Sequence, residues 1–247
     1  MIDLLFSFSA YLGIVATIIL ILKLLGKVEI RWKWLLLSLA LFILYFLAII
    51  IGIPLEPIFG QLSWNWGGKL LAIFLWMFAL IATLRLKPGF KMADAGFTFR
   101  QHQGSIKPTL IVIVVTLTFH LLLTYALGGS SYDTEELWFQ GLMPGLDEEP
   151  MFRGILLYFL TLALISSRIN LLGAHLNLAG LLLVIVFGLA HGLQFAGGAW
   201  NFSAVSILIT GLYGFVLLWI RERTGSLVFP IVAHNAINFL GQFVPAP

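Results

Sequence analysis

Charged residues are scarce in this chain, and cysteine is absent. Of the 247 residues only 10% are Asp, Glu, Lys or Arg, while 60% are hydrophobic. An ordinary soluble domain has about 25% charged residues, so this composition excludes one and indicates a membrane protein. The lack of cysteine excludes disulfides, thiolate nucleophiles and metal or iron–sulfur sites built on cysteine. Any chemistry must therefore use carboxylate, imidazole, hydroxyl or amine groups.

Several sequence signatures are also missing. The chain has no Walker A sequence, no Gly-x-Gly-x-x-Gly and no Gly-x-Ser-x-Gly. ATP-driven transport, Rossmann-type dinucleotide binding and a serine-hydrolase elbow therefore have no support. The net charge of +3 comes from basic residues in short gaps between apolar runs, where they orient helices in a bilayer. No nucleic-acid partner is expected.

What the chain does have is a series of long apolar segments. Each is about as long as the roughly 20 residues that a helix needs to cross a membrane. They are continuously apolar, whereas barrel strands would alternate polar and apolar residues, so helices are expected. The predicted fold is an all-α, polytopic integral membrane protein with about eight transmembrane helices. The segments span residues 4–22, 34–53, 66–84, 109–127, 148–167, 172–191, 203–220 and 227–244.

Basic residues lie almost entirely in alternate gaps between these segments. Twelve of the 14 Lys and Arg residues follow the first, third, fifth or seventh segment. Because basic loops stay in the cytoplasm, both termini are expected outside, in a plasma membrane. Of the other two, Lys69 is expected to extend to the outer interface, and Arg153 lies within the fifth segment. The twelve are Lys23, Lys27, Arg31, Lys33, Arg85, Lys87, Lys91, Arg100, Lys107, Arg168, Arg221 and Arg223.

A run of charged residues begins the fifth segment. Asp147 is a candidate N-cap after a Met-Pro-Gly breaker sequence, and Pro150 is tolerated in a first helical turn. Glu149 and Arg153 are four residues apart, so they share a helical face and are expected to pair. Glu148 points about 100° away and is available for another task. A solvated helix start explains Asp147, but an arginine one turn deeper favours a buried arrangement.

Two further clusters place histidine in apolar segments. His191 ends the sixth segment, four residues after Phe187, and by itself such a histidine is more often structural. His234 and Asn238 lie one turn apart on one face of the eighth segment. A polar pair that ties helices together is the competing interpretation. His120 has no companion motif and is interpreted as a histidine that tethers helices.

The predicted topology lets these clusters converge in the outer half of the bilayer. A carboxylate and an imidazole in a partly desolvated cavity can activate water, with Glu148 as general base. His234 and Asn238 can donate hydrogen bonds to the oxyanion of an attacked peptide carbonyl. Glu148, His191 and His234 also form a known ligand set for catalytic zinc. The residues leave both options open, and we favour water activation without a bound cofactor.

Three ordered motifs resemble those of the CPBP family, also called Abi, the type II CAAX prenyl protease-like intramembrane proteases. The motifs are Glu-Glu-x-x-x-Arg, Phe-x-x-x-His and His-x-x-x-Asn, within residues 148–238. The resemblance implies a membrane protease in which Glu148 activates water with His191, while His234 and Asn238 stabilise the oxyanion. That family is often labelled a metalloprotease, although a glutamate-dependent mechanism is also argued for it.

The resemblance also implies structural roles and a division of the chain. Glu149, Arg153 and Phe187 are expected to support the site. The whole chain, residues 1–247, is expected to form a single membrane domain, with four N-terminal helices in 1–130 and the CPBP-like catalytic core in 131–247.

The sequence therefore predicts an intramembrane endopeptidase, or hydrolase, acting on a membrane-associated or lipidated polypeptide among membrane lipids. One alternative is a catalytically silent family member that regulates another membrane protein. Another is an ion-coupled transporter, since intramembrane Glu and His also make relays. The presence of Glu148, His191 and His234 favours the enzyme, and no internal repeat or paired broken helices support a transporter. Zinc stays the alternative to a cofactor-free site, and nothing in the sequence indicates an oligomeric state.

Overall fold

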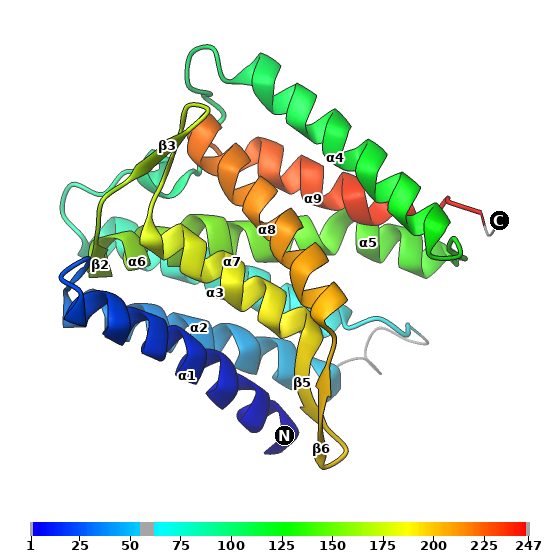
Figure 1. Ribbon diagram of the computed structural model, residues 1–247, viewed down its shortest axis with the longest axis horizontal. Coiled ribbons are helices and arrows are strands. Elements are labelled where there is room, and N and C mark those ends of the chain that lie inside the picture. The colour runs from blue at the N-terminus through cyan, green and yellow to red at the C-terminus, as the bar shows by residue number, and fades with distance from the viewer. Residues whose placement is uncertain (1, 55–61, 246–247) are drawn as a thin grey trace. The chain divides into compact units, whose positions relative to one another are not determined.

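Helices form most of the structure, a computed structural model that describes residues 2–54 and 62–245. The helices are α1 (Ile2–Leu24), α2 (Trp32–Gly52), α3 (Trp66–Leu86), η2 (Met92–Ala95), α4 (Ile106–Ala126), α5 (Thr134–Glu148), η3 (Glu149–Leu156), α6 (Leu157–Ala163), α7 (Leu178–Gly192), α8 (Ala204–Thr224) and α9 (Val228–Gly241) (Figure 1). The strands are β1 (Glu29–Ile30), β2 (Leu164–Ile165), β3 (Ile169–Leu171), β4 (Ala174–Leu176), β5 (Leu193–Ala196) and β6 (Ala199–Phe202). In the described residues, and apart from η2, these helices make eight segments, because α5, η3 and α6 follow one another without a break.

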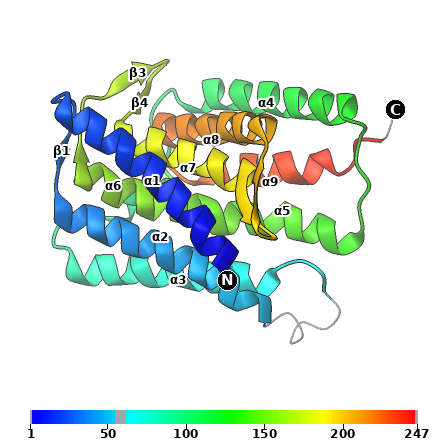
Figure 2. The same ribbon diagram turned by 60° about the horizontal axis from the view of Figure 1, so that its bottom comes forward.

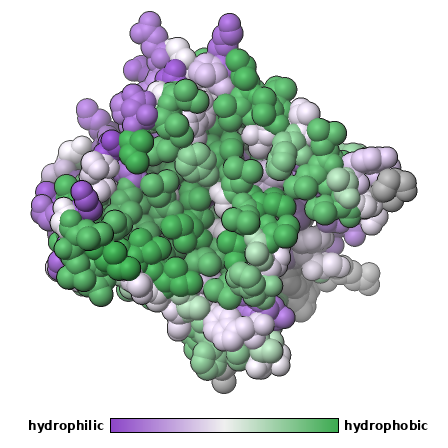
Figure 3. Space-filling model, in the orientation of Figure 1, coloured by the Kyte–Doolittle hydropathy of each residue, from purple (hydrophilic) through white to green (hydrophobic). Residues whose placement is uncertain are grey.

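Five of the described helices are long and apolar enough to cross a membrane, namely α1, α2, α3, α4 and α8. Most residues in their apolar stretches are not buried by the rest of the protein. Hydrophobic side chains accordingly cover much of the face drawn in Figure 3. Such exposure would be costly in water and is the expected pattern for helices that face lipid. The protein is therefore a multi-pass membrane protein with an all-α fold, which confirms the predicted fold class.

The chain forms two compact units, and the first contains the chain up to Leu39 together with Leu157–Trp219. In this unit α1 packs against α7 and β5, and α6 packs against α7 (Figure 2). The strands pair as three short antiparallel ribbons, β1 with β2, β3 with β4 and β5 with β6. A buried apolar cluster holds the unit together and comprises Ile19, Val28, Ala163, Leu164 and Leu182.

The second unit contains Ala40–Leu156 and the chain from Ile220 onward. Here α5 packs against both α3 and α9, and α4 packs against α9 (Figure 1). The helix α5 therefore has neighbours from the early and the late parts of the chain, and it ends at the acidic run. The boundaries of these units differ from the predicted division into residues 1–130 and 131–247. That residues 131–247 form the catalytic core stays a prediction.

The fifth helix begins well before the predicted residue 148, so its predicted start is wrong. Asp133 is the N-cap, and its side chain accepts a hydrogen bond from the backbone of Glu136. Asp147 is therefore not an N-cap. It lies in the last turn of α5 with its side chain fully buried.

Pro144 and Gly145, which were predicted to break the helix, lie inside α5. A side chain of the neighbouring helix α9 supplies a hydrogen-bond partner for the α5 backbone at this point. The backbone N–H of Gly145 donates to Asn235 Oδ1 on α9 at 2.7 Å. A Cβ at position 145 would lie 2.6 Å from the Ile231 carbonyl oxygen and 2.5 Å from Asn235 Oδ1. Glycine here permits the close approach of two helices instead of ending one of them.

The start of the sixth segment is also wrong, because residues before α7 form the β3–β4 hairpin. Its two turn residues, Leu172 and Gly173, have φ values of 49° and 85°. Two successive residues with positive φ are typical of a type I′ turn. Asn177 then caps α7 by accepting a hydrogen bond from Gly180 N at 2.9 Å. An apolar sequence around a tight turn has the same composition as the end of a membrane helix, which explains the error.

The contact at Gly145 predicts a stability effect. Gly145→Ala is expected to destabilise the protein by roughly 1–3 kcal/mol, since overpacking forces the helices α5 and α9 apart. Thermal unfolding of the purified protein in detergent measures this effect. Gly13→Ala in α1 is the control, because a Cβ there meets nothing within 4 Å. Equal melting temperatures for the two variants would show that α5 and α9 are not in close contact.

Candidate active site

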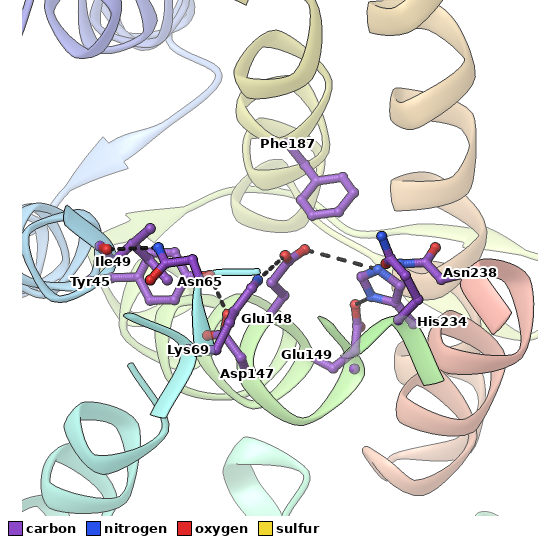
Figure 4. A network of polar contacts seen from close by, with 12 residues as sticks. Tyr45, Ile49, Asn65, Lys69, Asp147, Glu148, Glu149, Phe187, His234 and Asn238 are labelled. Atoms are coloured by element: carbon purple, nitrogen blue, oxygen red, sulfur yellow. Dashed lines mark hydrogen bonds and ion pairs between the residues drawn. The ribbon is translucent and has the colours of Figure 1, made fainter. Parts of the chain in front are cut away.

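A buried carboxylate, Glu149, joins two elements of the second unit. Its Oε1 accepts a hydrogen bond from Arg153 Nη1 at 3.1 Å. It accepts another from His234 Nδ1 at 2.8 Å (Figure 4). The first contact is the pair expected from the spacing of four residues. Because a carboxylate accepts only, His234 Nδ1 carries the proton. In the neutral imidazole Nε2 is then the acceptor.

The segment that carries Glu149 and Arg153 is the π-helix η3, in which every residue is buried. π-Helical turns are rare and frequently occur at functional sites. Arg221 Nε donates to the Arg153 carbonyl oxygen at 3.1 Å and so supplies a partner for one backbone oxygen of this segment. Gly96 lies against this guanidinium, since a Cβ at position 96 would overlap it.

Arg221 was expected in a cytoplasmic loop, and that expectation is wrong. It lies in the last turn of α8, and its side chain is buried. Its charge therefore contributes to packing around η3. Arg223, expected in the same loop, also lies in the last turn of α8.

Glu148 points toward a second set of polar side chains on α2 and α3. Lys69 Nζ lies 2.7 Å from Glu148 Oε1 and 2.7 Å from Asp147 Oδ2. Tyr45 OH donates to Asp147 Oδ2 at 3.1 Å (Figure 4). One ammonium thus pairs with two carboxylates in a site where the Glu148 side chain is only 15% exposed. Buried charges need such partners, because an unpaired one is costly.

Lys69 therefore does not extend to the interface as predicted. Its side chain is only 14% exposed because two acids hold it inside the protein. Lys69, Tyr45 and Asp147 are site residues that the motifs do not include. The available signal was a single lysine within an apolar segment, which indicates a functional or paired position by default.

The two polar sets meet between Glu148 and His234. Glu148 Oε2 lies 4.0 Å from His234 Nε2. This separation is too long for a direct hydrogen bond and suits two groups that share a small third molecule. Carboxylate oxygen and imidazole nitrogen thus face the same point from α5 and α9.

Asn238 lies one turn beyond His234 on α9, on the same helical face. Its Nδ2 donates to Gln140 Oε1 on α5 at 3.1 Å. Asn238 is half-buried, whereas His234 is buried. The second unit therefore brings together Glu148, Glu149, Arg153, His234 and Asn238.

Phe187 and His191 belong to the first unit, where they contact each other. His191 Nδ1 donates to the Phe187 carbonyl oxygen at 2.7 Å, and the two ring centroids are 4.8 Å apart. Phe187 is buried and His191 is exposed within its unit. Because Nδ1 donates to this carbonyl, the neutral His191 ring has Nε2 as its acceptor.

His120, interpreted as a helix-tethering histidine, approaches α9 closely. A Cβ at Gly241 would overlap His120 Nε2, so glycine is needed at that position. As for metals, no group of three or more His, Asp or Glu side chains in residues 2–54 and 62–245 has an arrangement that could hold an ion. The zinc alternative stays a prediction.

The fold and this site define a polytopic membrane protein with a paired acid and imidazole centre inside its helices. Residues 130–240 match the family model of the type II CAAX prenyl endopeptidase Rce1-like proteins. Residues 130–240 are therefore similar to this family, in agreement with the resemblance that the three motifs carry. No curated protein matches the chain. No solved structure matches it either.

The Glu149 contacts predict a double-mutant effect on stability. Arg153→Met is expected to lower stability by about 3–5 kcal/mol, because it removes one partner of a buried charge. Glu149→Gln combined with Arg153→Met should recover part of this loss, since Gln still accepts from His234. Chemical or thermal unfolding in detergent measures both. Arg31→Met is the control, because Arg31 is 54% exposed. An Arg153→Met variant as stable as the control would contradict a buried pair.

Proposed function

We propose that this protein is an intramembrane endopeptidase that hydrolyses a peptide bond of a membrane-associated or lipidated polypeptide. The observation that carries the proposal is the convergence of Glu148 Oε2 and His234 Nε2, 4.0 Å apart, inside an Rce1-like domain. A carboxylate and an imidazole at this separation can share one water molecule.

Glu148 is proposed as the general base. It accepts a proton from water, whose oxygen then attacks the carbonyl carbon of the substrate peptide. The resulting tetrahedral oxyanion collapses, the C–N bond breaks, and Glu148 returns the proton to the leaving amine. Lys69 is a positioning residue in this scheme, because it holds Oε1 and leaves Oε2 directed toward His234.

His234 is proposed to stabilise the oxyanion. The bond from Nδ1 to the Glu149 carboxylate fixes the orientation of the ring, and Nε2 donates a hydrogen bond when the imidazole carries a second proton. Asn238 carries an amide one turn further along the same face and can supply a second donor. The family motif assigns His191 to the same reaction with Glu148, and this assignment rests on the motif.

Replacing the proposed base is the test of this function. Glu148→Gln is expected to lower peptide cleavage by about 10²–10⁴-fold, the usual contribution of a positioned general base, while the melting temperature stays unchanged. Purified protein is incubated with a proteome-derived peptide library, and products are identified by mass spectrometry. Glu29→Gln, at a 71% exposed carboxylate, is the matched control and should cleave normally. Undiminished cleavage by Glu148→Gln would refute this role for Glu148.

We also propose that the reaction proceeds without a resident metal. The donor set argues for this, because the Lys69 ammonium is 2.7 Å from Glu148 Oε1 and would repel a divalent cation bound to that carboxylate. The purified protein is expected to contain well under one zinc per chain and to keep its activity in a chelator. A stoichiometric zinc content with activity lost on chelation and restored by zinc would contradict this proposal.

The proposed site of action is the plasma membrane, with both termini outside, on the evidence of the basic residues in alternate loops. Gln103 precedes α4 and Ser131 follows it, and both are exposed. A helix of 21 residues spans about 31 Å, so these positions lie at opposite membrane surfaces. In intact cells an impermeant maleimide should label Ser131→Cys and not Gln103→Cys. The reverse labelling would invert the topology. The chain has no cysteine of its own.

A further inference from the structure

We propose that a polar cavity between α4, α5 and α9 binds an uncharged peptide group of the substrate near the scissile bond. This inference rests on the proposed endopeptidase function and adds a substrate-binding subsite to it. The cavity has a volume of about 220 Å³. Six polar side chains line it, His120, Thr124, Ser130, Gln140, Asn238 and Gln242.

The chemistry of the lining indicates what the cavity can hold. None of the lining side chains is a carboxylate, an ammonium or a guanidinium. Such a lining offers neutral hydrogen-bond donors and acceptors and no counter-ion, so it suits an uncharged polar group better than an ion. Its volume is below the roughly 300–1,000 Å³ of pockets that enclose a whole small molecule. The cavity therefore fits a part of a longer ligand.

Two amides in the cavity carry complementary groups side by side. Asn238 Nδ2 donates to Gln140 Oε1 at 3.1 Å. This bond leaves Gln140 Nε2 as a donor and Asn238 Oδ1 as an acceptor, and neither has a hydrogen-bond partner in the part of the chain that the structure describes. A peptide unit presents one carbonyl acceptor and one N–H donor. The two amides can therefore bond to the backbone of an extended polypeptide whatever its side chains are.

The cavity lies along the same two helices as the proposed catalytic groups. Asn238 is four residues beyond His234 on α9, and Gln140 is eight residues before Glu148 on α5. At 1.5 Å per residue these separations are about 6 Å and 12 Å along the helix axes. An extended chain advances about 3.3 Å per residue. The bound peptide group should therefore lie about two to four residues from the scissile bond.

Gly241 on α9 makes room for a side chain of α4 in the wall of this cavity. His120 occupies the space that a Cβ at Gly241 would need, so the α4 side chain reaches the wall formed by α9. Ser130, in the connection between α4 and α5, donates to Gln242 Oε1 at 3.3 Å and closes another part of the wall. Three helices and a loop thus build the lining.

The test uses the full protein and a peptide that the wild type cleaves in a manner dependent on Glu148. Gln140→Leu and Gln140→Met remove the amide and keep an apolar side chain of similar size. Each is expected to raise KM about tenfold with kcat changed less than about twofold, because binding shared by the ground state and the transition state is lost. Gln103→Leu, an exposed glutamine outside the cavity, is the control. Thermal unfolding checks that each variant is folded.

A backbone ester series makes the test specific for a peptide group. Single peptide bonds two to four residues from the cleaved bond are replaced by esters, which removes one N–H at a time. One ester should raise the wild-type KM by about tenfold, and the same ester should have little effect on either Gln140 variant. Unchanged KM values for folded Gln140 variants, or equal ester effects in wild type and variants, would show that the cavity holds water only. In that case cleavage dependent on Glu148 would still stand, whereas a wild type that cleaves no peptide would overturn both proposals.

Discussion

The structure of the site depends on one buried carboxylate, that of Glu149. Its bond with Arg153 lies within η3, whereas its bond with His234 holds η3 and α9 together. A carboxylate without such partners would be too costly to bury among apolar helices. The same contact determines that Nδ1 is the ring nitrogen of His234 that donates, and it sets the direction in which Nε2 points. One interaction therefore fixes both the packing of this region and the orientation of an imidazole.

Three consecutive acids, at the end of α5 and the first residue of η3, have different partners because each side chain points in a different direction around the helix axis. Each residue is rotated by about 100° from the one before it. Asp147 contacts Lys69 and Tyr45, while Glu149 contacts Arg153 and His234. Glu148 lies between these sets, with one oxygen held by Lys69 and the other facing His234. Two paired charges thus flank the carboxylate that is proposed to handle the proton.

Close helix packing connects the site with the polar cavity. Gly145 lets α5 approach α9 to the distance at which its backbone bonds to Asn235, and Gly241 does the same for His120 of α4. Small residues are a common means of bringing membrane helices together, because lipid supplies no hydrophobic drive for helix association. Here they also bring polar side chains from separate helices to one place, where a substrate backbone would find its partners.

The sequence by itself determined the fold class, the approximate positions of most helices and the pairing of Glu149 with Arg153, because these follow from local composition and from helical periodicity. It also carried the three motifs that resemble the family whose model matches residues 130–240. Only the tertiary structure decided the partners of Lys69 and Asp147, since they come from elements more than 70 residues apart in the chain. The true start of α5 was hidden for the same reason. A proline–glycine pair predicts the end of a helix when only the sequence is considered. In the structure Asn235 on α9 accepts a hydrogen bond from the Gly145 N–H, and no local sequence pattern predicts such a contact.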